Sequence, residues 1–268
     1  MKKIVIFIVI LVFVFSCNDG DFDIPSLDFS SQDINDCGDL VLFKINETEA
    51  LFFELPNNNV LTEDTTTLEL IDAINYRIFN DGVTATYFCN EIPPSTPIIQ
   101  QEWSGSGTLN VTNIITRDDN DRVEEDSAIV DNPDTTINEA DIDEDGFPNY
   151  YDDDDDGDGI LTRNEVPLDE NDEPIFTDTD GDNTPNYLDN DDDGDGVLTI
   201  NESLANYLDS NVSVPLIVPN TTSINIHTLS YLATFTISNM SLINSSGNNI
   251  IFDTFDYGTK NGTIIIED

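Results

Sequence analysis

Runs of alternating apolar and polar residues occupy both ends of the chain and predict antiparallel β-strands. The first set comprises "DLVLFKI" (39–45), "ALFFEL" (50–55), "YRIFNDGVTATYF" (76–88) and "GTLNVTNIIT" (107–116). The second set comprises "INIHTL" (224–229), "YLATFTISNMSLI" (231–243), "NNIIFDTF" (248–255) and "GTIIIE" (262–267), with "NSSGNN" and "DYGTKNG" as turns. Within the first set, "LTEDTTTLELIDA" (61–73) fits either a strand or a helical turn.

The second set is too short to form an independent sandwich easily, because a domain of about 50 residues buries too little surface. "GTLNVTNIIT" and "ATFTISNMSLI" also share one style of alternation. We therefore predict a mainly β fold, a β-sandwich formed by residues 37–116 and 210–268 and split by an irregular insertion. Two separate β modules are the alternative.

The insertion contains an acidic block, residues 139–209, that repeats after 37 residues and follows a charged linker, residues 117–138. "DIDEDGFPNYYDDDDDGDGILTRNE" (141–165) matches "DTDGDNTPNYLDNDDDGDGVLTINE" (178–202) at nearly every informative position. Each unit contains two abutting loops, and the second loop begins 13 residues after the first. The block therefore predicts four similar loops.

The second loop of each unit fits the twelve-residue EF-hand template for calcium. That template uses carboxylates at positions one, three and five, a backbone carbonyl at seven and a bidentate glutamate at twelve. These positions are Asp154, Asp156, Asp158, Ile160 and Glu165 in the first unit, and Asp191, Asp193, Asp195, Val197 and Glu202 in the second. Gly159 and Gly196 occupy position six, where the chain turns sharply.

The first loop of each unit is a variant of that template. Its predicted ligands are Asp141, Asp143, Asp145 and Asp152 in one copy, and Asp178, Asp180, Asp182 and Asp189 in the other. A proline at position eight and a shorter terminal aspartate depart from the template, so we expect these sites to be weaker or shared with their neighbours. The run of five aspartates (152–156) arises where two loops abut, and it leaves Asp153 and Asp155 as intervening positions.

Loops that abut at 13 residues, with "DGFPNYYD" or "DNTPNYLD" running into "DDDGDG", resemble bacterial thrombospondin type 3 repeats. The resemblance covers residues 141–202 and implies a chain with little regular structure that wraps around a row of calcium ions. "RDDNDRVEED" (117–126) is a candidate decayed loop, but Arg122 stands where glycine is wanted, so we predict no site there.

The charge balance supports a cation ligand. The chain has 55 acidic and 8 basic residues, for a formal charge of −47. This balance argues against a nucleic-acid partner, whose phosphates need cationic side chains. Many flexible oxygen ligands favour calcium over magnesium, and the absence of Cys and His from residues 139–209 disfavours zinc. We expect about four Ca²⁺ ions, one for each loop.

The N-terminus predicts export. Lys2 and Lys3 precede an apolar run (4–15) of the length of a signal-peptide core. "VFSC" ends at Cys17 and resembles a bacterial lipobox, which predicts a signal peptide at 1–16, lipidation of Cys17 and a tether at 17–36. An ordinary secretory signal or an uncleaved anchor is the alternative. We expect a lipid-anchored protein at the outer membrane or cell surface of a Gram-negative bacterium.

Lipidation of Cys17 would leave Cys37 and Cys89 as a pair, so we predict a disulfide between them, with two free thiols as the alternative.

Signals for catalysis are weak. The single histidine, His227, is expected to be a surface or half-buried strand residue, and Trp103 a core or sheet-edge residue. Glu54 and Glu102 lie beside aromatic residues and are the carboxyls to inspect for a raised pKa. We therefore expect a structural, adhesion or assembly role with a surface protein or glycan partner. The alternative is a calcium-dependent surface hydrolase directed at carbohydrate or peptide, and a third option is a passive subunit of a surface complex.

Overall fold

The computed structural model describes residues 25, 27–38, 40–57, 59–90, 92–123 and 141–268. The predicted signal peptide (1–16), Cys17, the first part of the tether (17–24) and linker residues 124–138 lie outside the described residues. In the part of the chain that is described, no helix has both the length and the apolar character needed to cross a membrane.

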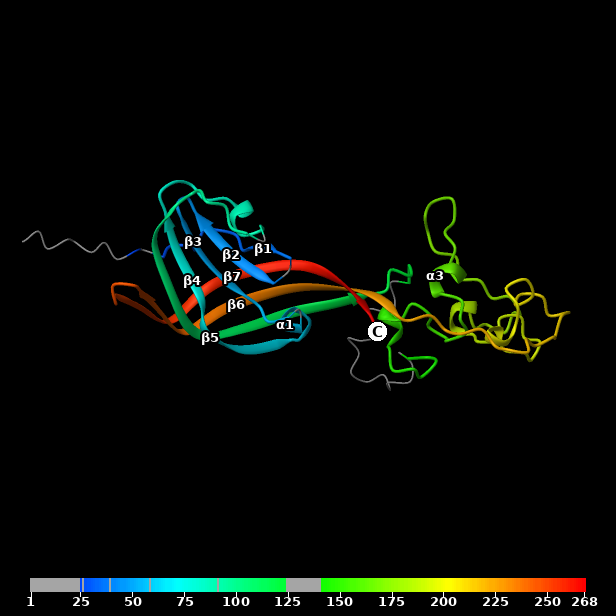
Figure 1. The fold of residues 1–268 in the computed structure, drawn as a ribbon. Coiled ribbons are helices and arrows are strands. Elements are labelled where there is room, and N and C mark those ends of the chain that lie inside the picture. The colour runs from blue at the N-terminus through cyan, green and yellow to red at the C-terminus, as the bar shows by residue number, and fades with distance from the viewer. Residues whose placement is uncertain (1–24, 26, 39, 58, 91, 124–140) are drawn as a thin grey trace, which may run out of the picture.

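One antiparallel sheet of seven strands, arranged in chain order, forms the body of the molecule (Figure 1). Its strands are β1 (Asn35–Cys37), β2 (Val41–Asn46), β3 (Glu49–Glu54), β4 (Thr65–Phe79), β5 (Ile99–Asp118), β6 (Ile226–Asn244) and β7 (Asn249–Glu267). Among the described residues, the helices are α1 (Asn59–Thr62) and α3 (Thr162–Glu165), with 3₁₀ turns η1 (Ala85–Tyr87), η3 (Asn149–Tyr151), η4 (Asn186–Leu188) and η5 (Thr199–Asn201). The predicted mainly β class is confirmed, but the described strands form one curled sheet rather than two facing sheets.

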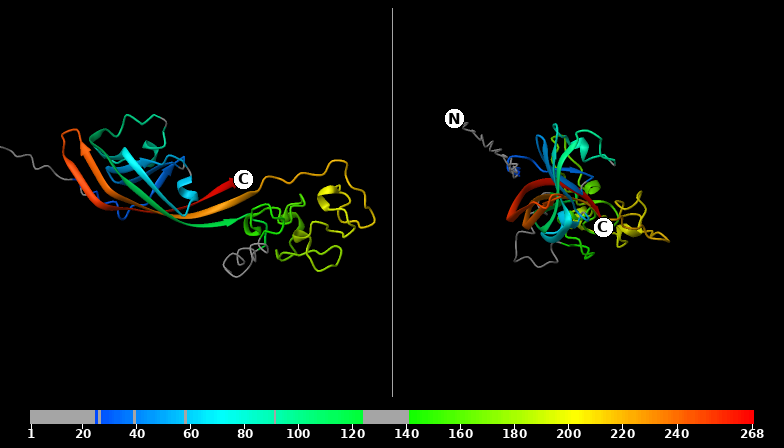
Figure 2. Two further views of the ribbon diagram at one scale, coloured as in Figure 1. Left: turned by 90° about the horizontal axis from the view of Figure 1, so that it is seen from below. Right: turned by 60° about the vertical axis from the view of Figure 1, so that its left-hand side comes forward.

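The acidic block is inserted between two paired strands. β5 pairs with β6 from Trp103 opposite Asn244 to Asp118 opposite Thr228. The strands on both sides of the block are therefore neighbours in one sheet. Figures 1 and 2 show the block beyond the end of the sheet where β5 stops and β6 begins.

The sheet curls until its last strand packs against its first ones. The Tyr257 hydroxyl of β7 donates to the carbonyls of Leu42 and Leu51 at 3.1 Å each. The Lys44 ammonium of β2 donates in return to the Tyr257 carbonyl at 2.9 Å. Large apolar side chains fill the inside of this curl, and Trp103 is among those that are fully buried. The curl therefore encloses the core that a second sheet would otherwise cover.

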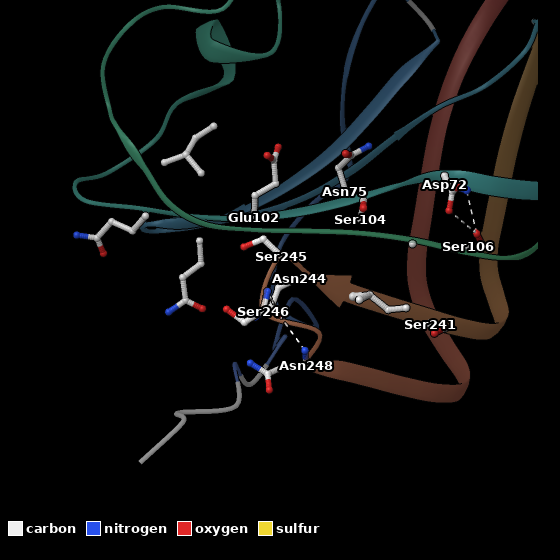
Figure 3. Close-up of a pocket in the computed structure, with 15 residues that line it drawn as sticks. Asp72, Asn75, Glu102, Ser104, Ser106, Ser241, Asn244, Ser245, Ser246 and Asn248 are labelled. Carbon is white, nitrogen blue, oxygen red and sulfur yellow. Dashed lines mark hydrogen bonds between the residues drawn. The ribbon is translucent and has the colours of Figure 1, made fainter. Parts of the chain in front are cut away.

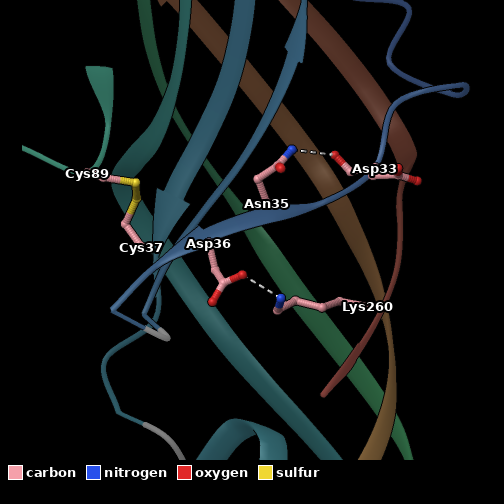
Figure 4. Close-up of polar contacts among 6 residues, drawn as sticks. All are labelled: Asp33, Asn35, Asp36, Cys37, Cys89 and Lys260. Atoms are coloured by element: carbon pink, nitrogen blue, oxygen red, sulfur yellow. Dashed lines mark hydrogen bonds and ion pairs between the residues drawn. A yellow bond between two sulfur atoms is a disulfide. The ribbon is translucent and has the colours of Figure 1, made fainter. Parts of the chain in front are cut away.

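Two further links hold the N-terminal edge. The predicted disulfide between Cys37 and Cys89 is confirmed. Lys260 of β7 forms an ion pair with Asp36 of β1 at 2.6 Å (Figure 4). The edge strand β1 is thereby connected both to the loop after η1 and across the curl to β7.

Segments predicted as tether, linker and turn carry more structure than expected. Leu27 and Phe29, in the predicted tether, are buried in the core. β5 continues to Asp118, inside the predicted linker. The turn predicted at "DYGTKNG" was wrong, because these residues lie within β7. Gly258 has a φ of +110° beside a register shift, so this glycine marks a β-bulge rather than a chain reversal.

Candidate metal centre

Backbone amides orient the aspartates of each second loop. The Asp158 N–H donates to Asp156 Oδ1 at 3.1 Å, and the Ile160 N–H donates to Asp158 Oδ1 at 2.6 Å. The corresponding bonds to Asp193 and Asp195 in the second unit are 3.2 and 2.8 Å long. Because one oxygen of each carboxylate is held by the backbone, the other oxygen is left free to bind a cation.

The turn at position six has the conformation that the template requires. Gly159 and Gly196 both have a φ of +89°, and Asn183 in a first loop has a φ of +83°. The Gly159 and Gly196 amides donate to Oδ2 of Asp154 and of Asp191, each at 3.1 Å. The chain therefore closes around the first aspartate of each second loop.

The two loops of each unit are packed against each other. A Cβ atom added at Gly157 would lie 2.4 Å from Asp143 Oδ2, and one added at Gly194 would lie 2.5 Å from Asp180 Oδ2. The first-loop carboxylate thus occupies the space that a side chain would need. This contact explains why glycine stands at position four of both second loops.

The first loops are closed by an asparagine that our sequence reasoning did not assign. Asn149 Oδ1 accepts the Ile142 N–H at 3.2 Å, and Asn186 Oδ1 accepts the Thr179 N–H at 2.9 Å. Both asparagines are buried. The repeated "PNY" was the signal that could have revealed them.

Acidic side chains converge in five groups among the described residues. Within each group, one carboxylate oxygen from every member lies within 4.8 Å of the others. The groups are Asp156, Asp158, Glu165 and Asp192; Asp119, Asp121 and Asp155; Asp141, Asp143 and Asp145; Asp178, Asp180 and Asp182; and Asp191, Asp193 and Asp195. Four predicted side-chain ligands, Asp152, Asp154, Asp189 and Glu202, are not members of a group.

The first of these groups, which we call the central group, combines the two units. Asp156, Asp158 and Glu165 come from the first unit, whereas Asp192 comes from position two of the second loop in the next unit. Position two was predicted to be an intervening position, so this role of Asp192 was not predicted from the sequence. The available signal was the aspartate that stands at position two in both units. The backbone N–H of Asp192 donates a hydrogen bond to Thr199 Oγ1 at 3.2 Å, which fixes the aspartate in place.

The central group is buried and electrostatically strained. Glu165 is only 6% exposed, and both of its carboxylate oxygens lack a hydrogen-bond partner. Burial, followed by the neighbouring carboxylates, raises the pKa of Glu165 to about 11, of Asp156 to about 9 and of Asp192 to about 8. Burying several carboxylates together is unfavourable unless a cation or protons neutralise them. The donor set therefore fits a hard divalent cation.

The two first-loop groups are more open. Asp141, Asp143 and Asp145 are half-buried or exposed, and all members of the group at 178–182 are exposed. Water can complete the coordination of an ion at such sites, but less of the binding energy comes from the protein. The weaker binding expected for the first loops stays a prediction.

The sheet carries a polar groove of about 1260 Å³ along β4, β5 and the end of β6 (Figure 3). Serine and amide side chains dominate its lining. Both carboxylates in the lining, Asp72 and Glu102, are exposed, and Glu102 forms an ion pair with Arg77 at 2.6 Å. Glu54 is exposed as well. None of these three groups has the buried setting of a general acid.

His227 lies in β6, as predicted, but it is buried rather than half-buried or at the surface. His227 is 2% exposed, and the Tyr151 ring of the first repeat unit covers it at a centroid distance of 4.9 Å. Burial lowers its pKa from the usual value. The histidine therefore belongs to the contact between sheet and repeats.

No protein-family model, curated protein or solved structure matches the chain.

Proposed function

We propose that the protein is an exported, lipid-anchored calcium-binding protein in which calcium orders the repeat segment. The observation that supports this proposal most directly is the central group, in which four buried carboxylates from two units lie within 4.8 Å of one another. An ion there would neutralise the charge that burial makes costly, and it would join segments that repel each other without it.

Calcium is the cation that this donor set favours. All side-chain ligands are oxygens, they sit on loops, and each unit offers a glutamate that can bind through two oxygens. Magnesium demands a near-ideal octahedron and keeps its water, so it matches these loops less well. By analogy with extracellular modules, we expect dissociation constants of about 10⁻⁴–10⁻³ M.

The biological role follows from where we expect the chain to be. Lipidation at Cys17 after a cleaved signal peptide would tether the protein to the outer membrane at the cell surface. There the calcium-filled repeats would act as a stiff element on the β body, in adhesion to a surface protein or glycan or in assembly of a surface complex. The hydrolase alternative gains no support from the groove, whose carboxylates are exposed.

Calorimetric titration of the full chain with calcium, repeated with magnesium, tests the proposal. We expect saturable binding of about four ions at the predicted loops, with magnesium weaker. Asp156→Asn should lower both the heat and the number of ions bound. Asp64→Asn is the matched control, because Asp64 is exposed on the β body. Unsaturable binding, or equal binding of the two metals, would refute the proposal.

A further inference from the structure

The spacing of 37 residues that relates the two repeat units also relates the first unit to residues just before the repeats. Asp119 and Asp121 stand 37 residues before Asp156 and Asp158 of the central group. The Asp121 N–H donates to Asp119 Oδ1 at 3.0 Å, and the Val123 N–H donates to Asp121 Oδ1 at 2.8 Å. The same two bonds orient the aspartates of each second loop, so the chain after β5 begins a third loop of this kind.

The backbone follows the same register in spite of different side chains. Arg122 has a φ of +88°, and Gly159, at the same position in the first unit, has a φ of +89°. Asn120 has a φ of +63°, and Gly157 has a φ of +68°. An arginine in the left-handed region is unfavourable on its own. The surrounding structure therefore holds the loop in this shape although the glycine is missing.

Carboxylates of this third loop lie close to an aspartate of the first unit, just as carboxylates of the first unit lie close to Asp192 of the second. Asp155 stands 37 residues before Asp192, and its carboxylate lies within 4.8 Å of those of Asp119 and Asp121. We call these three residues the junction group. Its three carboxylates stand 37 residues before Asp156, Asp158 and Asp192 of the central group, whereas Ala128 stands in the sequence 37 residues before Glu165.

Two carboxylate oxygens of the junction group are buried without a hydrogen-bond partner. Asp119 and Asp121 are 5% and 4% exposed, and the Oδ2 atom of each has no donor. The guanidinium of the neighbouring Arg122 is directed elsewhere, because it donates to the backbone carbonyls of Arg163 and Val166 at 3.0 Å each. Burial, followed by the Asp121 charge, raises the pKa of Asp119 to about 9.

An open space adjoins the junction group. Residues 117–123 and Tyr150 line a cavity of about 510 Å³. Such a cavity can admit a hydrated ion and keep the water molecules that complete its coordination. The junction group therefore has charged ligands on one side and room for water on the other.

We propose that Asp119, Asp121 and Asp155 form a further calcium site that fastens the end of β5 to the first repeat unit. This site rests on the proposed calcium binding by the repeats, but it adds an ion outside the four predicted loops. It lies where the two parts already touch: Asn225, just before β6, donates to the Tyr151 carbonyl at 3.0 Å and accepts the Asp153 N–H at 3.3 Å. Calcium at the junction group would hold the repeats at a fixed direction to the sheet.

Equilibrium dialysis of the full chain against labelled calcium tests this site, since it counts bound ions directly. We expect Asp119→Asn and Asp155→Asn each to bind one ion fewer than the unmodified chain, and the double variant to lose no further ion. Asp64→Asn is the matched control, because Asp64 is exposed and belongs neither to the junction group nor to the lining of the cavity. The control variant should bind as many calcium ions as the unmodified chain.

The failure of this inference differs from the failure of the proposed function. If the unmodified chain binds no calcium, the proposed function is wrong. If it binds calcium but Asp119→Asn keeps the full count, the proposed function stands and the junction site is refuted. Loss of an ion in Asp155→Asn alone would also refute it, because Asp155 would then serve only the repeats. If Asp119→Asn prevents folding, as judged by circular dichroism in EDTA, Asp121→Asn takes its place, because Asp121 belongs to the same segment and to the same group.

Discussion

The substitution Glu165→Gln should have opposite effects on stability with and without calcium. Glu165 ends the second loop of the first unit and belongs to the central group. In EDTA, the substitution removes a carboxyl that burial and four neighbouring aspartates make unfavourable. In calcium, it replaces a charged group that can bind through two oxygens by a neutral amide.

The size of the stabilisation in EDTA follows from proton linkage. The pKa of Glu165 is raised from 4.5 to about 11, so at pH 7 the folded form keeps the carboxyl protonated while the unfolded chain ionises it. At about 1.36 kcal/mol for each pH unit between 4.5 and 7, this difference in ionisation lowers the free energy of unfolding at pH 7 by about 3 kcal/mol. Glutamine does not titrate, so we expect it to recover up to about 3 kcal/mol of the free energy of unfolding.

In saturating calcium, the sign should reverse. We expect a loss of affinity of more than about 200-fold at this site, because the lost binding free energy must exceed the roughly 3 kcal/mol gained in EDTA. Thermal unfolding of the full chain in EDTA and in calcium measures both effects. Glu170→Gln is the matched control, because Glu170 is exposed and outside every acidic group. Destabilisation by Glu165→Gln in EDTA, or no difference from Glu170→Gln in calcium, would contradict the role of Glu165 as a buried calcium ligand.

Three further predictions concern the loops, the disulfide and pH. Gly157→Ala should weaken calcium binding more than Gly181→Ala in parallel titrations, because both glycines have a positive φ but only the first would bring a Cβ atom against Asp143. Replacing Cys37 and Cys89 by serine should lower the free energy of unfolding in urea by about 4 kcal/mol, the loop-entropy value for a separation of 52 residues, and a loss below about 1 kcal/mol would contradict it. In EDTA, unfolding temperatures should rise from pH 8 to pH 5, because carboxyl groups whose pKa is raised on folding take up protons more readily in the folded form. In limiting calcium the affinity should fall over the same range as protons compete with the ion, and an EDTA-treated protein that is less stable at pH 5 than at pH 8 would contradict the sign.

The loops could be predicted from the sequence because each position in them has a local consequence. A glycine at position six permits a positive φ, and aspartates two residues apart accept backbone amides within the same loop. The role of Asp192 could not be predicted in this way. Its partners belong to the other unit, and the spacing within its own loop says nothing about which carboxylates lie across that contact.

The strands could be predicted from the sequence, but their arrangement in one curled sheet could not. Alternation predicts that one face of each strand is buried, but not which element covers that face. A second sheet was the expected cover, whereas the strands curl and cover themselves, with Tyr257 of β7 reaching the carbonyls of Leu42 and Leu51. His227 shows the same difficulty, because its cover is Tyr151, 76 positions earlier in the chain.

Hydrogen exchange on the full chain, in calcium and in EDTA, separates the stability of the repeats from that of the sheet. We propose that the ordered form of residues 141–202 is only weakly stable without calcium and is stabilised by it, while the sheet is stable in both conditions. We predict that amides in the loops, such as those of Asp158 and Ile160, are protected in calcium and exchange rapidly in EDTA, whereas amides in the β5–β6 pairing stay protected in both. Equal protection of the loops with and without calcium would contradict the account.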